Sequence, residues 1–468
     1  MKQHFLDEDN KSQLKIGAVY LVANIVNKAI AFITIPVFSR LLTMGDYGMV
    51  STYSAYVTII YFFMGIASEY TVRNAFVDYK KEIPQYMSAM FLLCSFISIM
   101  VSCVIIVLNA FYFHVSSTFT CICCVIQSFM TYINTAMANK YMMEQNYIKR
   151  AVITATPNLC SVVLGIIFVL LLKNNRAEGR ILGYVIGISI FGIFNIFITW
   201  NKSRPCINKT YVKFILGLSP PLIIHGLSVV ALAQLDRIML TSYRNSSETG
   251  VYSIIYSLSM VAMAVTTALE GIWIPWFTNK YLERKYDEIN KRAGNYLLLT
   301  AILMFEIMLV APEVLKFMTP VTYWTGINLI PPLVASCFLM YMYSFSSGLE
   351  LFEKKTKQIA VITMFAAGTN ILLNYIFIPV FGALAASCTT LFSYFLSFIL
   401  HYLNARNINK KVFVSRIFFV PVLILLSGTI MFYICLNYVL IRWLIVIVIL
   451  AVLGYVLYKY PYIFIKTL

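Results

Sequence analysis

Long apolar stretches follow one another along almost the whole chain, and only short polar segments separate them. About fourteen of these stretches are long enough to cross the ~30 Å hydrocarbon core of a bilayer as helices. We expect the spans near residues 16–39, 48–68, 87–112, 117–139, 151–172, 181–200, 214–241, 249–271, 293–312, 327–350, 359–378, 382–404, 413–437 and 440–460. The connections are too short to hold a soluble catalytic domain. The pattern therefore predicts an all-α, multi-pass integral membrane protein.

Composition supports the same class of protein. Hydrophobic residues make up 60% of the 468 residues, charged residues only 12%, and the mean hydropathy is +0.80. A soluble protein of this size could not bury that much apolar surface. The charged N-terminal segment has no small-residue cleavage site before the first apolar run, so we expect no separable secretory signal.

The net charge of +17 is distributed unevenly. Most of the 36 lysines and arginines fall in alternate connections, which all lie on one side of the membrane if the N-terminus lies inside. This bias follows the positive-inside rule and predicts that both termini are cytoplasmic. The basicity thus reflects topology, and we expect no nucleic-acid partner. Arg180, Arg292 and Arg442 are assigned to the connections or span ends, and Lys28 and Arg237 are the two cations assigned to the interior of spans.

Nearly all ten cysteines lie inside the expected spans. The run "CICC" holds Cys121, Cys123 and Cys124, a spacing that could belong to a metal cluster or to packed thiols. Its neighbours are Ile, Val and Thr, with no clustered histidine or acid, and buried cysteine behaves as a small hydrophobe. We therefore expect packed thiols, no disulfide framework, no metal and no cofactor.

Three pairs of segments recur in the same order in the two halves of the chain. The pairs are 46–54 with 248–257, 80–83 with 286–289, and 144–154 with 353–363. The first aligns Gly48 with Gly250. Because six spans separate the copies, both keep the same orientation, which predicts two six-helix bundles related by a parallel repeat, with a site between them near the midplane. The expected domains are an N-terminal bundle, a C-terminal bundle and two extra helices, at 1–212, 213–405 and 406–468.

The first expected span carries a polar stripe in the segment "VANIVNKAI". Asn24, Asn27 and Lys28 are three and four residues apart, so they share one face of a helix. A charge inside a spanning helix usually faces the protein interior or a water-filled cavity. We therefore expect these side chains to line a cavity.

The seventh span carries the segment "ALAQLDRIML". Gln234 and Arg237 share a face, whereas Asp236 points elsewhere and lies three turns above His225. Arg237 could line a cavity together with Lys28. Alternatively, Asp236 and Arg237 could be a structural pair or reach the outer interface.

Two other groups of polar residues lie in or near spans. Glu306, in the ninth span, could load and release a coupling proton or could pair structurally with a neighbour. Glu350 and His401 lie near span ends, where we expect them at the membrane interface. Together with the two polar residues of the seventh span, Asp236 and His225, Glu306 is a candidate for ion coupling or charge pairing.

Three stretches resemble a known family: "TIPVFSRLLTMGDYGMVSTYSAY" at 34–56, "AQLDRIMLTSYRNSSETGVYSIIYS" at 233–257 and "NILLNYIFIPVFGALAASCTTLFSY" at 370–394. They resemble the signature stretches of bacterial polysaccharide flippases, the O-antigen and capsule repeat-unit translocases of the multidrug/oligosaccharidyl-lipid/polysaccharide exporter superfamily. The resemblance implies a V-shaped transporter in the inner (cytoplasmic) membrane. Such a protein moves an undecaprenyl-diphosphate-linked oligosaccharide to the outer leaflet, by ion-coupled alternating access, and supplies a polysaccharide polymerase and its chain-length machinery.

The resemblance also implies roles for individual residues. The cation in the first helix of the family corresponds to Lys28, and the Asp-Arg of its seventh helix corresponds to Asp236 and Arg237. Relatives carry further cavity arginines, for which this chain offers only Arg40. The substrate-binding candidates are therefore Lys28, Arg237, Asn24, Asn27, Gln234 and Arg40.

Two other functions compete with a flippase. A drug/cation antiporter of the same superfamily needs acids in its cavity, whereas Lys28 and Arg237 favour anions. A membrane-embedded polymerase or ligase needs a large outer loop with Arg and His, and the outer connections here are short. The chain has no GxxxxGK[ST] phosphate loop, so we expect neither ATP hydrolysis nor other enzyme activity.

Overall fold

The structure, a computed structural model, describes residues 30, 32–113 and 117–459, and within these residues the chain forms helices and no strand. The first part holds an apolar helix at Phe32–Leu41 and then α2 (Met44–Met64), η1 (Ser68–Tyr70), α3 (Thr71–Asp78), α4 (Ile83–Leu108), η2 (Asn109–Phe113), α5 (Thr118–Met143), α6 (Tyr147–Leu171), α7 (Arg176–Lys202) and α8 (Lys209–Tyr243). The second part holds α9 (Ser246–Ser259), α10 (Ala262–Leu282), α11 (Tyr286–Met318), η3 (Val321–Leu329), α12 (Ile330–Phe352), α13 (Thr356–Ile408), α14 (Arg416–Ile434) and α15 (Val439–Lys459).

These helices confirm the expected all-α membrane architecture. Ten helices of the described part are long and apolar enough to cross a membrane, or eleven if α2 and the η1–α3 segment count as one bent span. The expectation of about fourteen spans is consistent with this number, because α13 contains two expected spans, 359–378 and 382–404, which meet at a non-helical break at Gly382. A further expected span, 249–271, is divided between α9 and α10.

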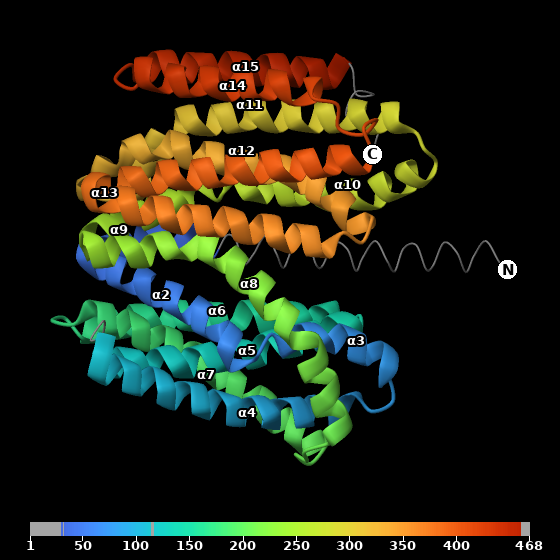
Figure 1. Cartoon of the computed structure of the whole chain (residues 1–468). Coiled ribbons are helices and arrows are strands. Elements are labelled where there is room, and N and C mark those ends of the chain that lie inside the picture. Colours follow the sequence, from blue (N-terminus) through green and yellow to red (C-terminus); the bar gives the residue numbers. More distant parts are fainter. Residues whose placement is uncertain (1–29, 31, 114–116, 460–468) are drawn as a thin grey trace. The chain divides into compact units, whose positions relative to one another are not determined.

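The described residues form two compact units, one up to Ile238 and one from Met239 on, so the boundary lies within α8. In the first unit α6 and α5 pack along α7, and α2 packs on α5 (Figure 1). In the second unit α12 packs along α13, and α11 packs on α14. The division of the sequence at 212/213 and 405/406 stays a prediction.

The starts of α2 and α9 show the internal repeat in structural detail. Thr43 caps α2 by accepting a hydrogen bond from the Asp46 backbone N–H at 3.1 Å. Asn245 caps α9 in the same way, accepting from the Glu248 N–H at 2.9 Å. A side-chain oxygen at this position satisfies one of the free N–H groups of the first helical turn. The aligned segments of the two halves therefore begin a helix with the same local geometry.

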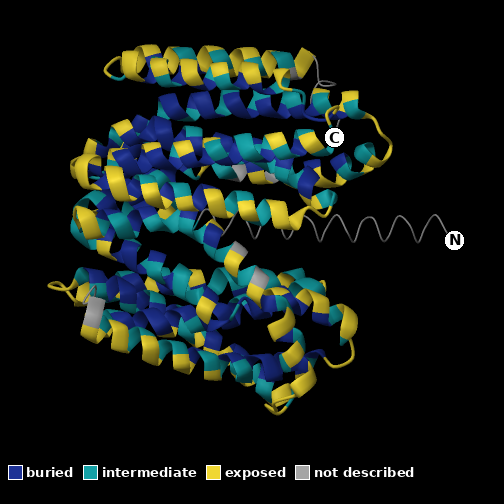
Figure 2. Cartoon of the chain, in the orientation of Figure 1, coloured by how far each residue is buried: buried dark blue, intermediate teal, exposed yellow. Residues whose placement is uncertain are grey.

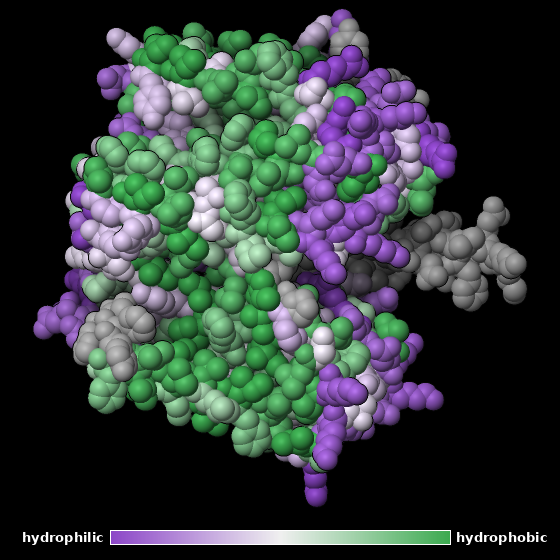
Figure 3. Space-filling view, in the orientation of Figure 1, coloured by the Kyte–Doolittle hydropathy of each residue, from purple (hydrophilic) through white to green (hydrophobic). Residues whose placement is uncertain are grey.

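The distribution of exposed side chains fits a bilayer. Within the second unit α15 exposes most of its apolar side chains, whereas α11 buries 15 of its 33 residues (Figure 2). Apolar side chains cover the middle of this unit's helices, and hydrophilic ones gather where α10 joins α11 (Figure 3). Such an apolar surface is stable in contact with lipid and not with water.

Candidate functional site

Arg237, near the end of α8, is a buried cation with 8% of its surface exposed. Its Nη1 donates hydrogen bonds to the Ala233 carbonyl oxygen at 2.9 Å and to Gln234 Oε1 at 2.6 Å. Gln234 itself is partly buried. Because both partners lie on the preceding turn of the same helix, Gln234 fixes the direction of the guanidinium without neutralising its charge.

Asp236 is buried beside Arg237, with 1% of its surface exposed. Consecutive residues on an α-helix point about 100° apart, so the carboxylate and the guanidinium leave α8 in different directions. A buried charge is stable only when other charges or hydrogen bonds compensate it. The end of α8 in the first unit thus carries two buried charges of opposite sign on two helix faces.

Arg180, on α7, is a second buried cation in the same unit, with 3% exposed. Its guanidinium lies between the rings of Phe38 and Tyr184, 3.8 and 3.9 Å from their centroids, and Nη1 donates to the Ser161 carbonyl at 2.7 Å. A desolvated cation over an aromatic ring gains about 2 kcal/mol. The two rings thus stabilise a charge that the sequence analysis wrongly assigned to a connection.

A glycine on α6 makes this position of Arg180 possible. A Cβ atom at Gly165 would lie 2.2 Å from Arg180 Nη1, which is closer than any real Cβ contact. Gly183, one turn after Arg180 on α7, lies against Gly165 in turn. Small residues let two helices approach closely in a membrane. The stretch "RAEGRILGYVIG" is the sequence signal that could have indicated a buried arginine in this helix.

Tyr47, on α2, connects the two arginines electrostatically. The charges of both Arg180 and Arg237 act on its hydroxyl group, so both guanidinium groups lie within Coulombic range of Tyr47. We call Arg180, Arg237 and Tyr47 the cationic cluster. It combines two positive charges with one hydroxyl donor inside the first unit, an arrangement suited to an anion and not to a cation.

The other residues expected to bind substrate are placed as follows. Arg40 is exposed at the end of the Phe32–Leu41 helix, and its Nη1 donates to the Pro36 carbonyl at 2.9 Å. Asn24, Asn27 and Lys28 lie outside the described residues. The backbone of His225 belongs to α8, but its side chain also lies outside the described part.

Glu306 is buried in α11 of the second unit, with 6% exposed. Its Oε1 has no hydrogen-bond partner, although a carboxyl oxygen in a buried position is stable only with a donor or a proton. Glu306 therefore has the local environment of a protonatable group, and its role in coupling stays a proposal.

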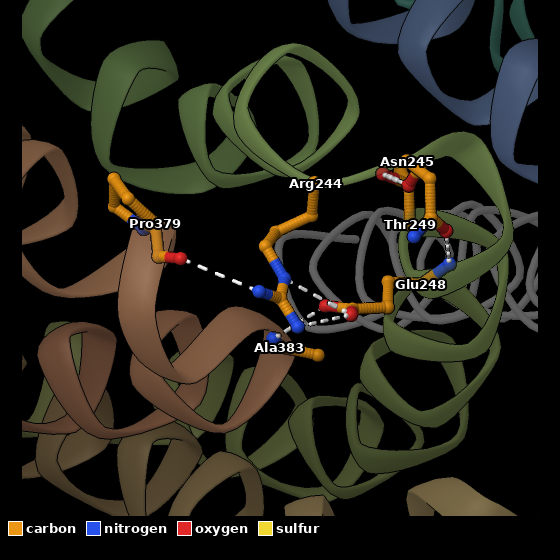
Figure 4. A network of polar contacts seen from close by, with 6 residues as sticks. All are labelled: Arg244, Asn245, Glu248, Thr249, Pro379 and Ala383. Carbon is orange, nitrogen blue, oxygen red and sulfur yellow. Dashed lines mark hydrogen bonds and ion pairs between the residues drawn. The ribbon is translucent and has the colours of Figure 1, made fainter.

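The second unit has a polar network where α8 ends and α9 begins (Figure 4). Arg244 bonds Glu248 through Nε and Nη2, each 3.1 Å from Glu248 Oε1, and its Nη1 donates to the Pro379 carbonyl at 3.3 Å. Glu248 Oε2 accepts from the Ala383 backbone N–H at 3.2 Å. Gly382, between these two positions of α13, has φ +56° and ψ −135°. The network thus bonds backbone groups on both sides of the break in α13.

Several other charged residues lie deeper than the sequence analysis expected. Glu350 and His401, expected at the interface, are 0% and 1% exposed and bond each other. Arg292 is 1% exposed and lies 4.3 Å from the centroid of a Trp276 ring. Arg442 is 1% exposed and pairs with a glutamate on α11. Hydropathy places these residues near span ends, and only side-chain packing shows that they point inward.

In the described part of the chain, no three His, Cys, Asp or Glu side chains are grouped so that they could hold a metal ion. Cys121, Cys123 and Cys124 are buried in α5 as free thiols. Cys123 and Cys124 belong to a cluster of buried apolar side chains.

The fold defines the class of the protein as a multi-pass, all-α membrane protein. The chain is similar to the lipid II flippase MurJ in an inward closed conformation, with a TM-score of 0.72 and 15% identity, covering 94% of this chain and 99% of that one. An inward-facing multidrug resistance MATE family transporter of the MOP superfamily gives 0.58 and 14%, covering 81% and 97%. The MATE multidrug transporter DinF-BH gives 0.55 and 14%, covering 85% and 95%.

The sequence identifies the family within that class. Residues 14–280 match the polysaccharide biosynthesis protein family, and the chain belongs to this family. A Lsg locus protein of Haemophilus influenzae is 25% identical over 287 residues, which cover 58% of this chain and 67% of that protein. The resemblance noted in the sequence is confirmed at the level of this family.

Proposed function

We propose that this protein is a flippase that moves an undecaprenyl-diphosphate-linked oligosaccharide repeat unit from the cytoplasmic to the outer leaflet of the bacterial inner membrane, for O-antigen, capsule or exopolysaccharide synthesis. Membership in the polysaccharide biosynthesis protein family supports this substrate class. The likeness in fold to a lipid II flippase supports the transport step. The observation that carries the proposal is the cationic cluster of Arg180, Arg237 and Tyr47.

The cluster addresses the main physical barrier to this reaction. A diphosphate that enters a low-dielectric environment loses its hydration at a large cost in free energy unless cations compensate the charge. Arg237 can donate two parallel hydrogen bonds to phosphate oxygens, and Gln234 holds it in position. Arg180 is fixed between two rings and adds positive potential. The hydroxyl of Tyr47 supplies a neutral donor.

The remaining candidates complete the proposal. Lys28, with Asn24 and Asn27 on the same face, would be a further cation for the diphosphate, and Arg40 would act at the end of that helix. Of the two roles expected for Asp236, orienting Arg237 or limiting the positive charge of the empty site, we propose the second, because Gln234 already orients Arg237. An ion gradient would drive alternating access of the two bundles, with Asp236, Glu306 and His225 as candidate coupling groups.

The membrane orientation follows from the same proposal. With both termini in the cytoplasm, the substrate enters from the cytoplasmic leaflet and leaves on the outer side. The polyprenyl tail stays in lipid throughout. A polysaccharide polymerase with its chain-length machinery would then use the product.

Replacement of Arg237 tests the proposal. We expect Arg237→Ala to lower surface polysaccharide at least about tenfold, since the loss of one charged hydrogen-bond donor to phosphate costs more than 1.4 kcal/mol. Lipid-linked repeat units should accumulate on the inner leaflet, while the level of the protein in the membrane stays normal. Arg237→Lys should retain part of the activity.

Lys173→Ala is the matched control, because it removes one positive charge from an exposed position of the same unit. It should leave export unchanged. Normal export by Arg237→Ala at normal membrane levels would contradict the proposal. Efflux of a cationic dye by the wild-type chain, with no effect of the protein on surface polysaccharide, would instead favour the drug/cation antiporter.

A further inference from the structure

Glu350 on α12 and His401 on α13 form a fully buried pair inside the second unit. His401 Nδ1 lies 2.7 Å from Glu350 Oε2, and Asn404 donates from Nδ2 to Glu350 Oε1 at 2.8 Å. The exposed fractions of the two titratable side chains are 0% and 1%. Since α12 and α13 pack along each other, this pair is a polar link across a helix–helix interface.

Three neighbours bear on the charge of the pair. The ring of Tyr343 stacks on the His401 imidazole, with centroids 5.4 Å apart and an interplanar angle of 19°. Glu270, on α10, acts electrostatically on Tyr343. Lys355 donates its backbone N–H to the Glu350 carbonyl at 2.8 Å, and its side chain is exposed. Among the described residues no lysine or arginine forms an ion pair with Glu350.

Proton occupancy therefore decides the charge of the pair. The Glu350 carboxylate accepts from the Asn404 amide, and it can accept a second hydrogen bond from His401 Nδ1–H. His401 Nε2 is buried and has no hydrogen-bond partner. With Nε2 unprotonated, the pair carries a net charge of −1 in a buried position. A proton on Nε2 makes the pair neutral, and the lone N–H costs less than an uncompensated buried charge.

We propose that Glu350 and His401 are a proton-binding site that couples proton movement to transport. The inference rests on the proposed function, because it names the ion step of that flippase. A proton from water binds His401 Nε2 and stabilises the packing of α12 on α13. When the two helices separate, water reaches Nε2, the proton leaves, and the Glu350 carboxylate is hydrated. In the predicted topology these ends of α12 and α13 face the cytoplasm, so the proton exchanges on that side.

Direct observation of the imidazole tests the binding site. We would record ¹⁵N NMR spectra of the full-length chain in lipid nanodiscs between pH 5 and 9, with ¹⁵N-histidine and with Gln in place of His4, His114 and His225. We expect His401 to change its protonation state within this range. In Glu350→Gln the midpoint should fall by at least one pH unit, which is tenfold weaker proton binding.

Asn374→Ala is the matched control for this experiment. It removes a hydrogen bond of 3.0 Å between two buried side chains of α13, Asn374 and Asn370, without removing a titratable group. The His401 midpoint should not move in this variant. A His401 ring that keeps one protonation state from pH 5 to 9, or whose midpoint is the same in Glu350→Gln, would overturn the proposal. If Glu350→Gln does not fold, the titration of the chain with Glu350 intact still shows whether His401 binds a proton between pH 5 and 9.

Transport measurements separate this inference from the proposed function. The probe is a fluorescent polyprenyl-diphosphate-linked disaccharide in proteoliposomes with an imposed pH gradient. We expect the wild-type rate to change by up to about tenfold per pH unit, and the His401→Gln rate to be independent of the gradient. A wild-type transport rate that does not depend on the pH gradient would overturn the proton site but would not contradict the flippase. Absence of transport would contradict the flippase, and the NMR titration would still decide on proton binding.

Discussion

The carboxylate of Glu248 accepts a hydrogen bond from the backbone N–H of Ala383, with Oε2 and N 3.2 Å apart (Figure 4). This bond joins two of the three sequence stretches that carried the family resemblance, 233–257 and 370–394. The N–H follows directly on Gly382, where α13 is interrupted. Glu248 thus acts as a cap for the second part of α13, as a side-chain acceptor does at an ordinary helix start.

Substitution of Gly382 tests this break. Gly382 has φ +56°, which side-chain-bearing residues rarely adopt, and a Cβ there would lie 2.2 Å from Glu248 Oε2. We expect Gly382→Ala to destabilise the second unit by about 1–3 kcal/mol, measured as a lower Tm of the purified chain. Gly368→Ala is the control, because Gly368 lies in α13 with open space around it. Equal Tm values for both variants would show that the break tolerates a side chain.

The position of Arg180 depends on Gly165. We expect Gly165→Ala to displace the Arg180 guanidinium from between Phe38 and Tyr184, because the new methyl group would occupy the space of Nη1. Surface polysaccharide should fall severalfold, with normal amounts of protein in the membrane. Gly217→Ala, at an exposed position of α8 in the same unit, should leave export unchanged. Export that Gly165→Ala does not alter would remove Arg180 from the proposed site.

The ion pair between Arg442 on α15 and Glu313 on α11 holds the last helix in place. Arg442 Nη2 lies 2.5 Å from Glu313 Oε1, and Nη1 donates to the Leu309 carbonyl at 3.1 Å. We expect Arg442→Met to destabilise the second unit by about 1–4 kcal/mol, because it leaves Glu313 without its partner. Glu313 is about one-fifth exposed, so the cost lies below that of a fully buried acid.

A double-mutant cycle measures this coupling. The added change Glu313→Gln removes the unpaired charge, so we expect the variant with both substitutions to recover part of the lost Tm. If the two single substitutions simply add, the pair contributes no coupling energy.

The connection between α10 and α11 should respond to pH and salt. Hydrogen bonds from Lys285 and then Lys280 lower the pKa of the exposed Glu283. A lowered pKa gives stability that is present above the ordinary pKa of Glu, about 4.3, and lost as the pH falls through the lowered value. We expect hydrogen exchange of residues 280–288 to rise as the pH falls below about 4, after correction for the intrinsic rate.

Two comparisons check this assignment. Glu283→Gln should remove most of the acid response, and high salt should weaken it, because exposed ion pairs are screened. Asp287→Asn, at an exposed acid of the same segment, should keep the response. If hydrogen exchange of residues 280–288 still rises at low pH in Glu283→Gln, a group other than Glu283 causes the rise.

The sequence alone established the class of fold, because the physical requirement is local. Each span must be apolar over the thickness of the bilayer, and this is a property of consecutive residues that no distant contact can change. The repeat was also visible in the sequence, as three pairs of similar segments that recur in the same order. The structure adds that the helices of the first pair are capped by Thr43 and Asn245 through residues three positions away. Gln234 and Arg237 share a face for the same reason.

Only the tertiary structure decided which charges are buried among other helices. Arg180, Glu350 and His401 lie near the ends of apolar stretches, and hydropathy cannot distinguish a side chain at the interface from one that points inward. Their environment comes from residues far away in the sequence: Phe38 and Ser161 for Arg180, and α12 against α13 for the Glu350–His401 pair. Burial of a charge depends on such partners from other helices, so the apolar pattern determined the fold and the packing determined the sites.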